Sequence, residues 1–171
     1  MMRLYDMGLE RLKSIILEMA KLSEQGVANA VDSRSYNTIG SMQSSRRVEE
    51  LENLHAEAVE LASDMLTKYQ PTASDRRFMK SCMEMAYVFS HSSDYAYDLL
   101  HASAVFGNLS GLKKGVVEET TRQASELLRL NMKAFLNRDD EPSANVARMD
   151  EIVDEVYLSL AKKLVAPTIS T

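Results

Sequence analysis

The chain has few of the residues that break regular structure or cross-link it. Six glycines and three prolines stand among 171 residues, tryptophan is absent, and there is one cysteine. Glycine and proline together make up about 5% of the chain, against about 12% in average proteins, which argues against an all-β fold with its many turns. The single Cys82 excludes an intramolecular disulfide and a zinc site built from several cysteines.

The sequence also lacks a long apolar run and an excess of basic residues. No run reaches the roughly 18 residues of a membrane span, and the charged, amphipathic start MMRLYDMGLERLK is unlike a signal peptide. Twenty basic and 25 acidic residues give a net charge of −5. Binding to nucleic acid or to anionic membranes needs a basic surface. We therefore expect a cytoplasmic protein that binds no nucleic acid and does not insert into membranes.

What the sequence does contain is helical periodicity. Five stretches repeat apolar residues at helical spacing; they cover about 3–31, 42–69, 75–105, 109–136 and 143–164. The breaks fall at 32–45, at Pro71, at 106–108 and at Pro142. Long helices joined by short links predict an all-α antiparallel helix bundle.

The apolar positions of the first three stretches predict the core. The residues expected inside are Leu4, Met7, Leu12, Ile15, Met19, Leu22, Val27, Val48, Leu51, Leu54, Ala58, Leu61, Met65, Phe78, Cys82, Met85, Phe89, Ala96, Leu100 and Ser103. Cys82 lies on this apolar face, so we interpret it as a small buried residue and not as a nucleophile. Ser74 is the expected N-cap of the third helix.

A weak internal repeat divides the chain. The segment LENLHAE at 51–57 is echoed by MDEIVDE at 149–155, about 98 residues later. This predicts a complete three-helix repeat at 1–106 and a partial second repeat at 107–171, formed by a two-helix hairpin and a short C-terminal tail. Two helices cannot bury their apolar faces alone. We expect the hairpin to pack on the first repeat or on the same hairpin of a second chain, which would make a homodimer.

Three segments resemble the PhoU family. The sequence QPTASDRR at 70–77 is similar to the family's turn Gln-Pro-x-Ala-x-Asp-Leu-Arg between its second and third helices. SHSSDYAYD at 90–98 is similar to Glu-Arg-x-Gly-Asp-x-Ala-x-Asn, and MDEIVDEVY at 149–157 is similar to Asp-x-x-Val-Asp-x-Leu-Tyr. The resemblance spans about residues 4–165 and is most specific at 70–77.

The resemblance implies tandem three-helix bundles and a function. Members of the family are non-enzymatic regulators of phosphate uptake and phosphate signalling, placed between a phosphate transporter, with its ATPase subunit, and a sensor kinase. Related domains belong to other ion-transport regulators, so an accessory role for a potassium or divalent-cation transporter stays open. Some members bind iron or zinc clusters through acidic residues four apart on the third helix of each repeat.

Candidate metal ligands lie on one side of the predicted third helix. His91, Asp94, Asp98 and His101 fall within about 80° of arc, opposite the apolar face. Carboxylates one turn apart can share a cation, and imidazoles extend the set toward Zn²⁺ or Fe. A solvated polar face is the alternative. Ser90 replaces the family's first acidic residue, so the acidic pair is shifted by one turn.

Two further patterns in the sequence could bind a metal. Asp150 and Asp154 form a second pair one turn apart, with helix solubility as the alternative. Glu52-x-x-His55 and Asp98-x-x-His101 superficially resemble the Glu-x-x-His pairs of di-iron bundles. An antiparallel hairpin would leave these two pairs about 13 Å apart along its axis. A di-iron enzyme is therefore disfavoured, whereas a metal-binding or metal-storing bundle stays an alternative to the regulator.

Overall fold

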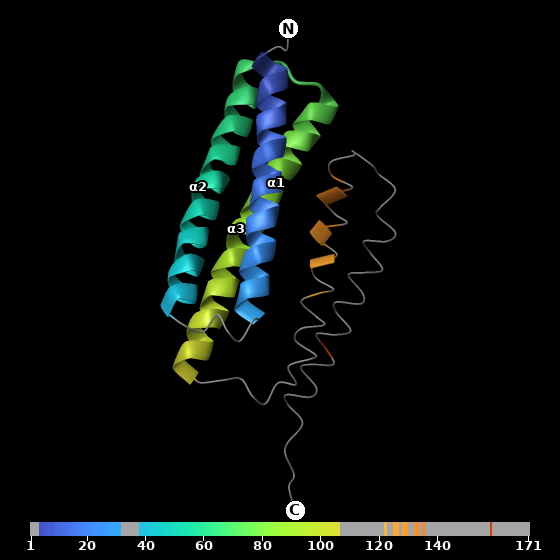
Figure 1. Ribbon diagram of the computed structural model, residues 1–171. Helices are drawn as coiled ribbons and strands as arrows, with labels where there is room; N and C mark the ends of the chain where they lie inside the picture. Colours follow the sequence, from blue (N-terminus) through green and yellow to red (C-terminus); the bar gives the residue numbers. More distant parts are fainter. Residues whose placement is uncertain are drawn as a thin grey trace, which may run out of the picture. The chain divides into compact units, whose positions relative to one another are not determined.

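The structure, a computed structural model, describes residues 4–31 and 38–106, together with positions 122, 125, 126, 128, 129, 132, 133, 135 and 158. Three helices follow one another: α1 (Leu4–Val31), α2 (Thr38–Lys68) and α3 (Ala73–Phe106). They run alternately down, up and down, so that α1 and α3 begin at the same end (Figure 1). Over the described residues the prediction of an all-α antiparallel bundle is confirmed.

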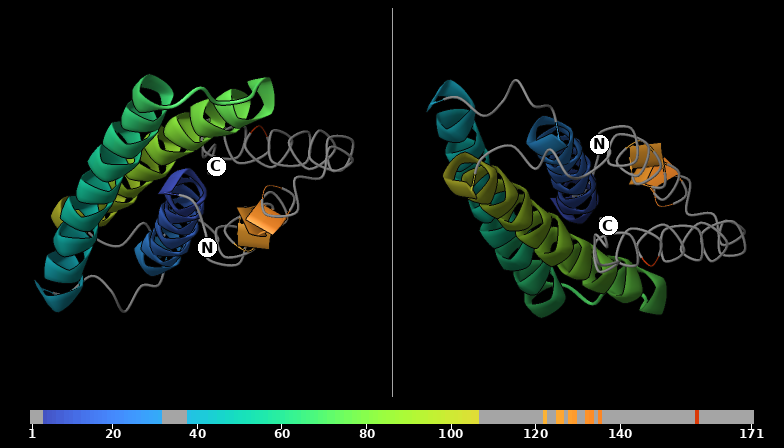
Figure 2. Two further views of the ribbon diagram at one scale, coloured as in Figure 1. Left: turned by 90° about the horizontal axis from the view of Figure 1, so that it is seen from above. Right: turned by 90° about the horizontal axis from the view of Figure 1, so that it is seen from below.

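Each helix contacts the other two, which closes a core between them. The views along the bundle show α1 beside both α2 and α3 (Figure 2). The buried apolar residues of this unit come from all three helices: Leu12, Ile15, Ile16, Met19, Ala20, Leu51, Ala58, Ala62, Met65, Met79, Cys82, Ala86 and Phe89. Burial of these side chains is the main term that holds the three helices together.

The predicted core is wrong at the start of α1. Leu4 is 75% exposed and Met7 is 51% exposed. At 100° per residue, Met7 lies about 140° around the helix from Leu12, which is fully buried. The first turn of α1 therefore directs these apolar side chains to solvent, although their spacing along the sequence looks helical.

A threonine and not the predicted Ser74 caps α3. The Thr72 hydroxyl accepts a hydrogen bond from the Asp75 backbone N–H at 3.2 Å and donates one to Asp75 Oδ2 at 2.8 Å. The bond from the Asp75 N–H, on the third residue of α3, makes Thr72 the N-cap of this helix. Ser74 is exposed and already lies inside the helix, which begins at Ala73. The cap is one residue before the helix, so the shift follows from where α3 begins.

The second helix begins earlier than its sequence predicts. It starts at Thr38 and not near 42, within the stretch of serine, asparagine and glycine that was expected to form the break at 32–45. Ser44 in this part of α2 is only 4% exposed. A stretch of serine, asparagine and glycine therefore continues a helix where its composition predicted a break.

At the end of the bundle where α1 and α3 finish, several buried residues are small and polar and not large and apolar. Ser23, Ser90 and Ser93 are each at most 6% exposed. A Cβ atom built on Gly26 would lie 3.4 Å from the Ser93 hydroxyl oxygen and 3.5 Å from Arg47 Cδ. The helices therefore approach closely here, with little apolar volume between them.

The chain divides into two compact units, Met1–Gly107 and Asn108–Thr171. The first contains α1, α2 and α3. In the second, the positions described between 122 and 135 are helical, and Arg122 pairs with Glu126 at 3.4 Å. The predicted hairpin otherwise lies outside the described residues, so the partial second repeat stays a prediction. Among the helices described, none is long and apolar enough to cross a membrane.

Candidate functional site

Three aromatic rings meet at the seam between α2 and α3. The rings of Tyr87 and His91, one turn apart on α3, have centroids 4.1 Å apart at an interplanar angle of 34°. His55 of α2 meets the ring of Tyr87 edge-on, with centroids 6.2 Å apart. Tyr87 nevertheless stays 53% exposed. The helical register alone brings these three side chains together, because His55 lies level with Tyr87 in the antiparallel pair.

His91 carries a polar atom that its surroundings leave unsatisfied. Its Nδ1 is buried and has no hydrogen-bond partner among the described residues. A ring nitrogen without a partner is a cost to the folded state. The half-buried imidazole therefore stabilises the fold through packing of its ring on Tyr87, and not through a hydrogen bond at Nδ1.

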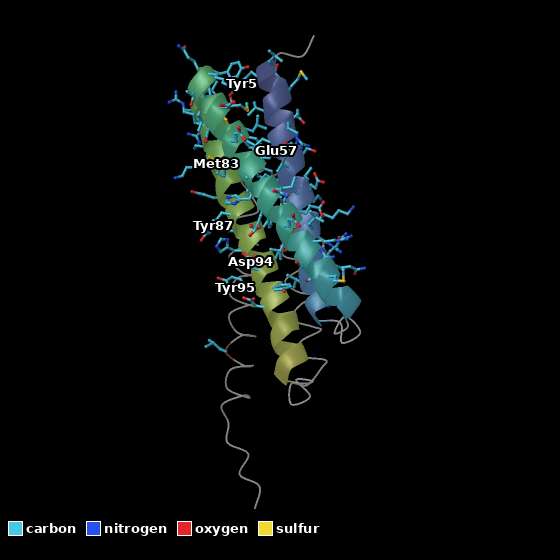
Figure 3. All side chains as sticks on the ribbon, turned by 90° about the vertical axis from the view of Figure 1, so that its left-hand side faces the viewer. Tyr5, Glu57, Met83, Tyr87, Asp94 and Tyr95 are labelled. Atoms are coloured by element: carbon cyan, nitrogen blue, oxygen red, sulfur yellow. The ribbon has the colours of Figure 1, made fainter. Side chains whose placement is uncertain are left out.

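The predicted acidic pair lies further along the same helix. Asp94 is half-buried and Asp98 is exposed, one turn apart. Figure 3 shows Asp94 on α3 between Tyr87 and Tyr95. Ser90, at the position of the family's first acidic residue, is 6% exposed. The side chain that replaces the acid therefore faces the bundle and not the solvent.

The described donors do not by themselves make a metal site. Within the part of the chain that the structure describes, no three His, Cys, Asp or Glu side chains come close enough to hold an ion. Asp94 and Asp98 supply only two carboxylates from a single helix. The side chain of His101 and the pair Asp150 and Asp154 lie outside the described residues, so their predicted role stays a prediction.

The position of His55 along the bundle also tests whether the two pairs of the di-iron pattern can meet. His55 lies beside Tyr87, and Asp98 follows Tyr87 by 11 residues, or about 16 Å along a helix. The Glu52–His55 and Asp98–His101 pairs are therefore separated along the bundle, as the sequence predicted.

Cys82 is not a nucleophile. Its side chain is fully buried, and burial raises the pKa of the thiol to about 12. The thiolate is the reactive form of cysteine, and at neutral pH Cys82 is therefore present as the unreactive thiol. The interpretation of this residue as part of the core is confirmed.

An ion pair joins the sides of α1 and α2, and two tyrosine rings pack at the end of the bundle where the chain begins. Arg11 of α1 donates two hydrogen bonds to the Glu57 carboxylate of α2, from Nε at 2.8 Å and from Nη2 at 2.9 Å. At the end where the chain begins, the rings of Tyr5 and Tyr69 have centroids 5.3 Å apart. Burial and the neighbouring Asp75 carboxylate raise the pKa of the Tyr5 phenol.

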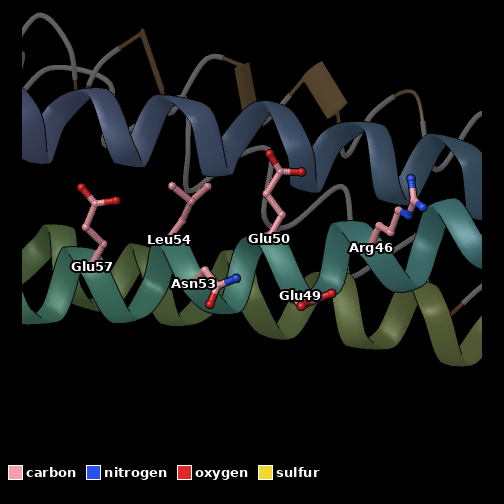
Figure 4. A pocket seen from close by; sticks show the side chains of 6 residues that line it. All are labelled: Arg46, Glu49, Glu50, Asn53, Leu54 and Glu57. Atoms are coloured by element: carbon pink, nitrogen blue, oxygen red, sulfur yellow. The ribbon is translucent and has the colours of Figure 1, made fainter.

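A shallow groove runs along α2. Glutamates dominate its lining, which consists of Arg46, Glu49, Glu50, Asn53, Leu54 and Glu57. Glu50, Leu54 and Glu57 project toward α1, as Figure 4 shows. All six lining residues come from one helix, and the groove is open to solvent. It lacks the concave, mostly apolar walls of a small-molecule site, and the sequence did not indicate it.

Comparison with known proteins gives the family. The model of the PhoU domain matches residues 16–102, from the middle of α1 almost to the end of α3. A phosphate-specific transport system accessory protein PhoU homolog of Zymomonas mobilis subsp. mobilis is 24% identical over 162 residues, which cover 94% of this chain and 68% of that protein. The turn at 70–77 and the acidic pair Asp94 and Asp98 lie within the matched domain. Since this match spans 87 of the 171 residues, the chain belongs to the PhoU domain family.

Proposed function

We propose that this chain is a non-enzymatic regulator of phosphate uptake and phosphate signalling that acts by binding other proteins. The observation that carries the proposal is its relationship, over 94% of its length, to a protein named for an accessory role in phosphate-specific transport. The PhoU domain match over α1, α2 and α3 supports it. The expected partners are the ATPase subunit of a phosphate transporter and a sensor kinase.

The surface of the first unit suits an adaptor. Its helices are 28, 31 and 34 residues long, so they present faces about 42 to 51 Å in length. Tyr87, Val88 and Tyr95 of α3 are each more than half exposed. Large aromatic side chains on an exposed helix face are typical anchors of protein interfaces. The groove along α2, in contrast, does not enclose a substrate.

Binding and uptake measurements test this proposal together. Deletion of the gene in its own host should alter radiolabelled phosphate uptake and the expression of a phosphate-responsive reporter. The purified protein should capture the phosphate-transport ATPase subunit or the sensor kinase from the same genome. Restoring the gene should restore both readouts.

Uptake of potassium and of divalent cations separates the alternative transporter from the proposed one. If deletion changes cation uptake and leaves phosphate uptake and the reporter as they were, the proposal is wrong and the accessory role belongs to another ion. No change in any of these readouts would equally contradict it.

Modulation by a metal is a further part of the proposal, and it depends on donors outside the described residues. Iron or zinc bound in stoichiometric amount, and lost in Asp94→Ala with Asp98→Ala, would support it. Metal-free preparations of both proteins would remove the metal from the mechanism and leave protein binding alone. The same analysis addresses the alternative of a metal-storing bundle.

A further inference from the structure

One arginine lies on the inner side of the bundle without a counter-ion. Arg47 of α2 is half-buried and falls within about 60° of arc of Ser44 and Leu51, which are 4% and 0% exposed. Among the residues that the structure describes, none forms an ion pair or a hydrogen bond with it. Cationic side chains that leave water are normally paired, because an unpaired charge loses its hydration. Arg47 therefore needs an anion that the described residues do not supply.

A buried hydroxyl close to Arg47 is also without a partner. Ser93 of α3 is 3% exposed, and its Oγ accepts or donates no hydrogen bond with any described residue. A Cβ atom built on Gly26 of α1 would lie 3.4 Å from this oxygen and 3.5 Å from Arg47 Cδ. Because both distances start from one point, the hydroxyl oxygen and the arginine stem are at most about 7 Å apart.

Packing does not require a glycine at position 26. At Gly8, the other glycine of α1, a Cβ atom would lie 2.7 Å from Met65 Sδ, so a side chain would clash. At Gly26 the nearest atoms would lie at ordinary contact distances. Glycine inside a helix is less stable than alanine. Gly26 therefore leaves open a space, beside Ser93 and Arg47, that a methyl group would fill.

A single ligand accounts for these three features. An arginine whose charged head reaches water would explain Arg47 alone, and it would leave the Ser93 hydroxyl unsatisfied. The guanidinium and the hydroxyl both donate hydrogen bonds, so the group that completes them must be an acceptor. The planar fork of arginine matches two oxygens of a phosphate-like ion. A small oxyanion thus satisfies both groups at once.

We propose that Arg47, Ser93 and Gly26 form a binding site for one free tetrahedral oxyanion, the class of inorganic phosphate and sulfate. Arg47 supplies the positive charge, Ser93 supplies a hydroxyl donor and Gly26 supplies the space. The three residues come from α2, α3 and α1, so a bound ion joins all three helices at the end where α1 finishes and α2 begins (Figure 1). This site goes beyond the proposed function, which depends on protein binding.

Burial determines which ions the site accepts. Because Ser93 is 3% exposed and Arg47 is half-buried, a free ion fits better than the same group carried on a larger molecule. The buried side chains one turn earlier on α1 and α3, Ser23 and Ser90, are neutral and do not repel an anion. The site therefore favours a small, free oxyanion.

Calorimetry on the purified full chain tests the site. Inorganic phosphate is titrated at constant ionic strength in a buffer that contains EDTA, so that a bound metal cannot hold the ion. We expect one phosphate per chain with a Kd below about 1 mM, and a melting temperature that rises with phosphate concentration. Sulfate should compete. Phosphoserine, which carries a phosphate group on an amino acid, should bind more weakly.

A pair of neighbouring arginines locates the charge. Arg47→Gln should weaken phosphate binding by about tenfold or more, because it removes a charged hydrogen-bond donor. Arg46→Gln is the matched control, since it removes the same charge from the exposed arginine next to it. Salt screens an exposed charge, so this control should change the affinity by less than about twofold. Unchanged circular dichroism verifies that both variants fold.

Two further variants separate loss of binding from loss of stability. Ser93→Ala should weaken phosphate binding by about fivefold, whereas Ser92→Ala should not, because the Ser92 hydroxyl donates to the Val88 carbonyl. Gly26→Ala fills the space of the ion and should also weaken binding. Alanine favours the helix, so Gly26→Ala should be at least as stable as the unmodified protein without phosphate.

The proposal is overturned if the unmodified protein binds neither phosphate nor sulfate. Equal losses in Arg46→Gln and Arg47→Gln, or unchanged affinity in both Ser93→Ala and Gly26→Ala, would also overturn it. Tighter binding of phosphoserine than of phosphate would contradict the assignment to a free ion. The readout is ion binding by the purified protein, so it stands apart from the uptake and capture experiments that test the regulator.

Discussion

Two single residues, Thr72 just before α3 and Cys82 within it, affect stability from opposite environments. Thr72 is exposed and acts because its hydroxyl completes the hydrogen bonds of a helix end. Cys82 is buried and acts because its thiol must stay neutral. The first effect is independent of pH over the neutral range, and the second depends on it.

Removal of the cap should destabilise the first unit. Thr72→Ala leaves the Asp75 N–H without its acceptor, and we expect a loss of about 1 kcal/mol in the free energy of unfolding. Ser74→Ala, two residues on, should have little effect because Ser74 lies inside α3 and the capping hydrogen bond is made by Thr72. Urea denaturation of both variants measures the difference, and equal losses would contradict the assignment of Thr72 as the cap.

Burial of Cys82 should make it unreactive in the folded protein. An aromatic disulfide reagent should label it slowly without denaturant, at a rate set by opening of the bundle, and quickly in denaturant. Rapid labelling of the folded protein would contradict the burial.

The raised pKa of Cys82 also gives stability a pH dependence. The thiol has a pKa of about 12 when folded, against an ordinary value of 9.0. Below pH 9 it is neutral in both states, so its contribution is fully present. As pH rises toward 12, the unfolded chain loses this proton first and the free energy of unfolding falls.

Tyr5 acts in the same direction above pH 10, because its pKa is also raised in the folded protein. Thermal melts between about pH 8 and about pH 11 should therefore show a steeper fall for the unmodified protein than for Cys82→Ala. Parallel curves for the two proteins would contradict this contribution of the thiol.

At the scale of whole helices, the core changes character along the bundle. Near the beginning of α1 and α3 it consists of leucine, isoleucine, methionine and cysteine side chains. Toward the other end, buried serines and Gly26 let the helices approach closely. Hydroxyls bring less hydrophobic stabilisation than methyl groups of similar size. That end should therefore open more readily.

Ser93 gives a direct test of this polar part of the core. Its hydroxyl oxygen is buried, and no described residue hydrogen-bonds to it. Ser93→Ala removes an unsatisfied polar group, and we expect it to stabilise the protein by about 1 kcal/mol. Ser92→Ala is the control, because the Ser92 hydroxyl donates to the Val88 carbonyl at 2.7 Å and its loss should not stabilise. Destabilisation by Ser93→Ala would indicate that an ordered water satisfies the hydroxyl.

For the whole molecule, the division after Gly107 predicts how much of the chain folds alone. Three amphipathic helices close a core, and the buried residues of α1, α2 and α3 lie on the sides that face one another. Residues 1–107, expressed alone, should therefore be helical and should melt in one cooperative transition. A fragment that is unfolded or melts without a transition would mean that residues 108–171 are needed to complete the core.

The helices themselves follow from the sequence. The period of Leu12, Ile15 and Met19, and the scarcity of glycine and proline, determine three long helices whatever their partners. The break near Pro71 could be placed because proline lacks a backbone N–H and ends one helix before the next begins. The family could likewise be inferred from residues 70–77, within the domain that the comparison matches.

The tertiary structure decided which side of each helix is buried at its ends, and which side chains meet across helices. Met7 has helical spacing yet faces solvent, because it lies about 140° around α1 from the buried Leu12. Ser44 is polar yet buried, because its position on α2 lies on the inner side of the bundle. His55 meets Tyr87 only because an antiparallel register makes them level. A periodic sequence specifies a helix from neighbours three and four residues apart, whereas register and helix rotation depend on residues far apart in the chain.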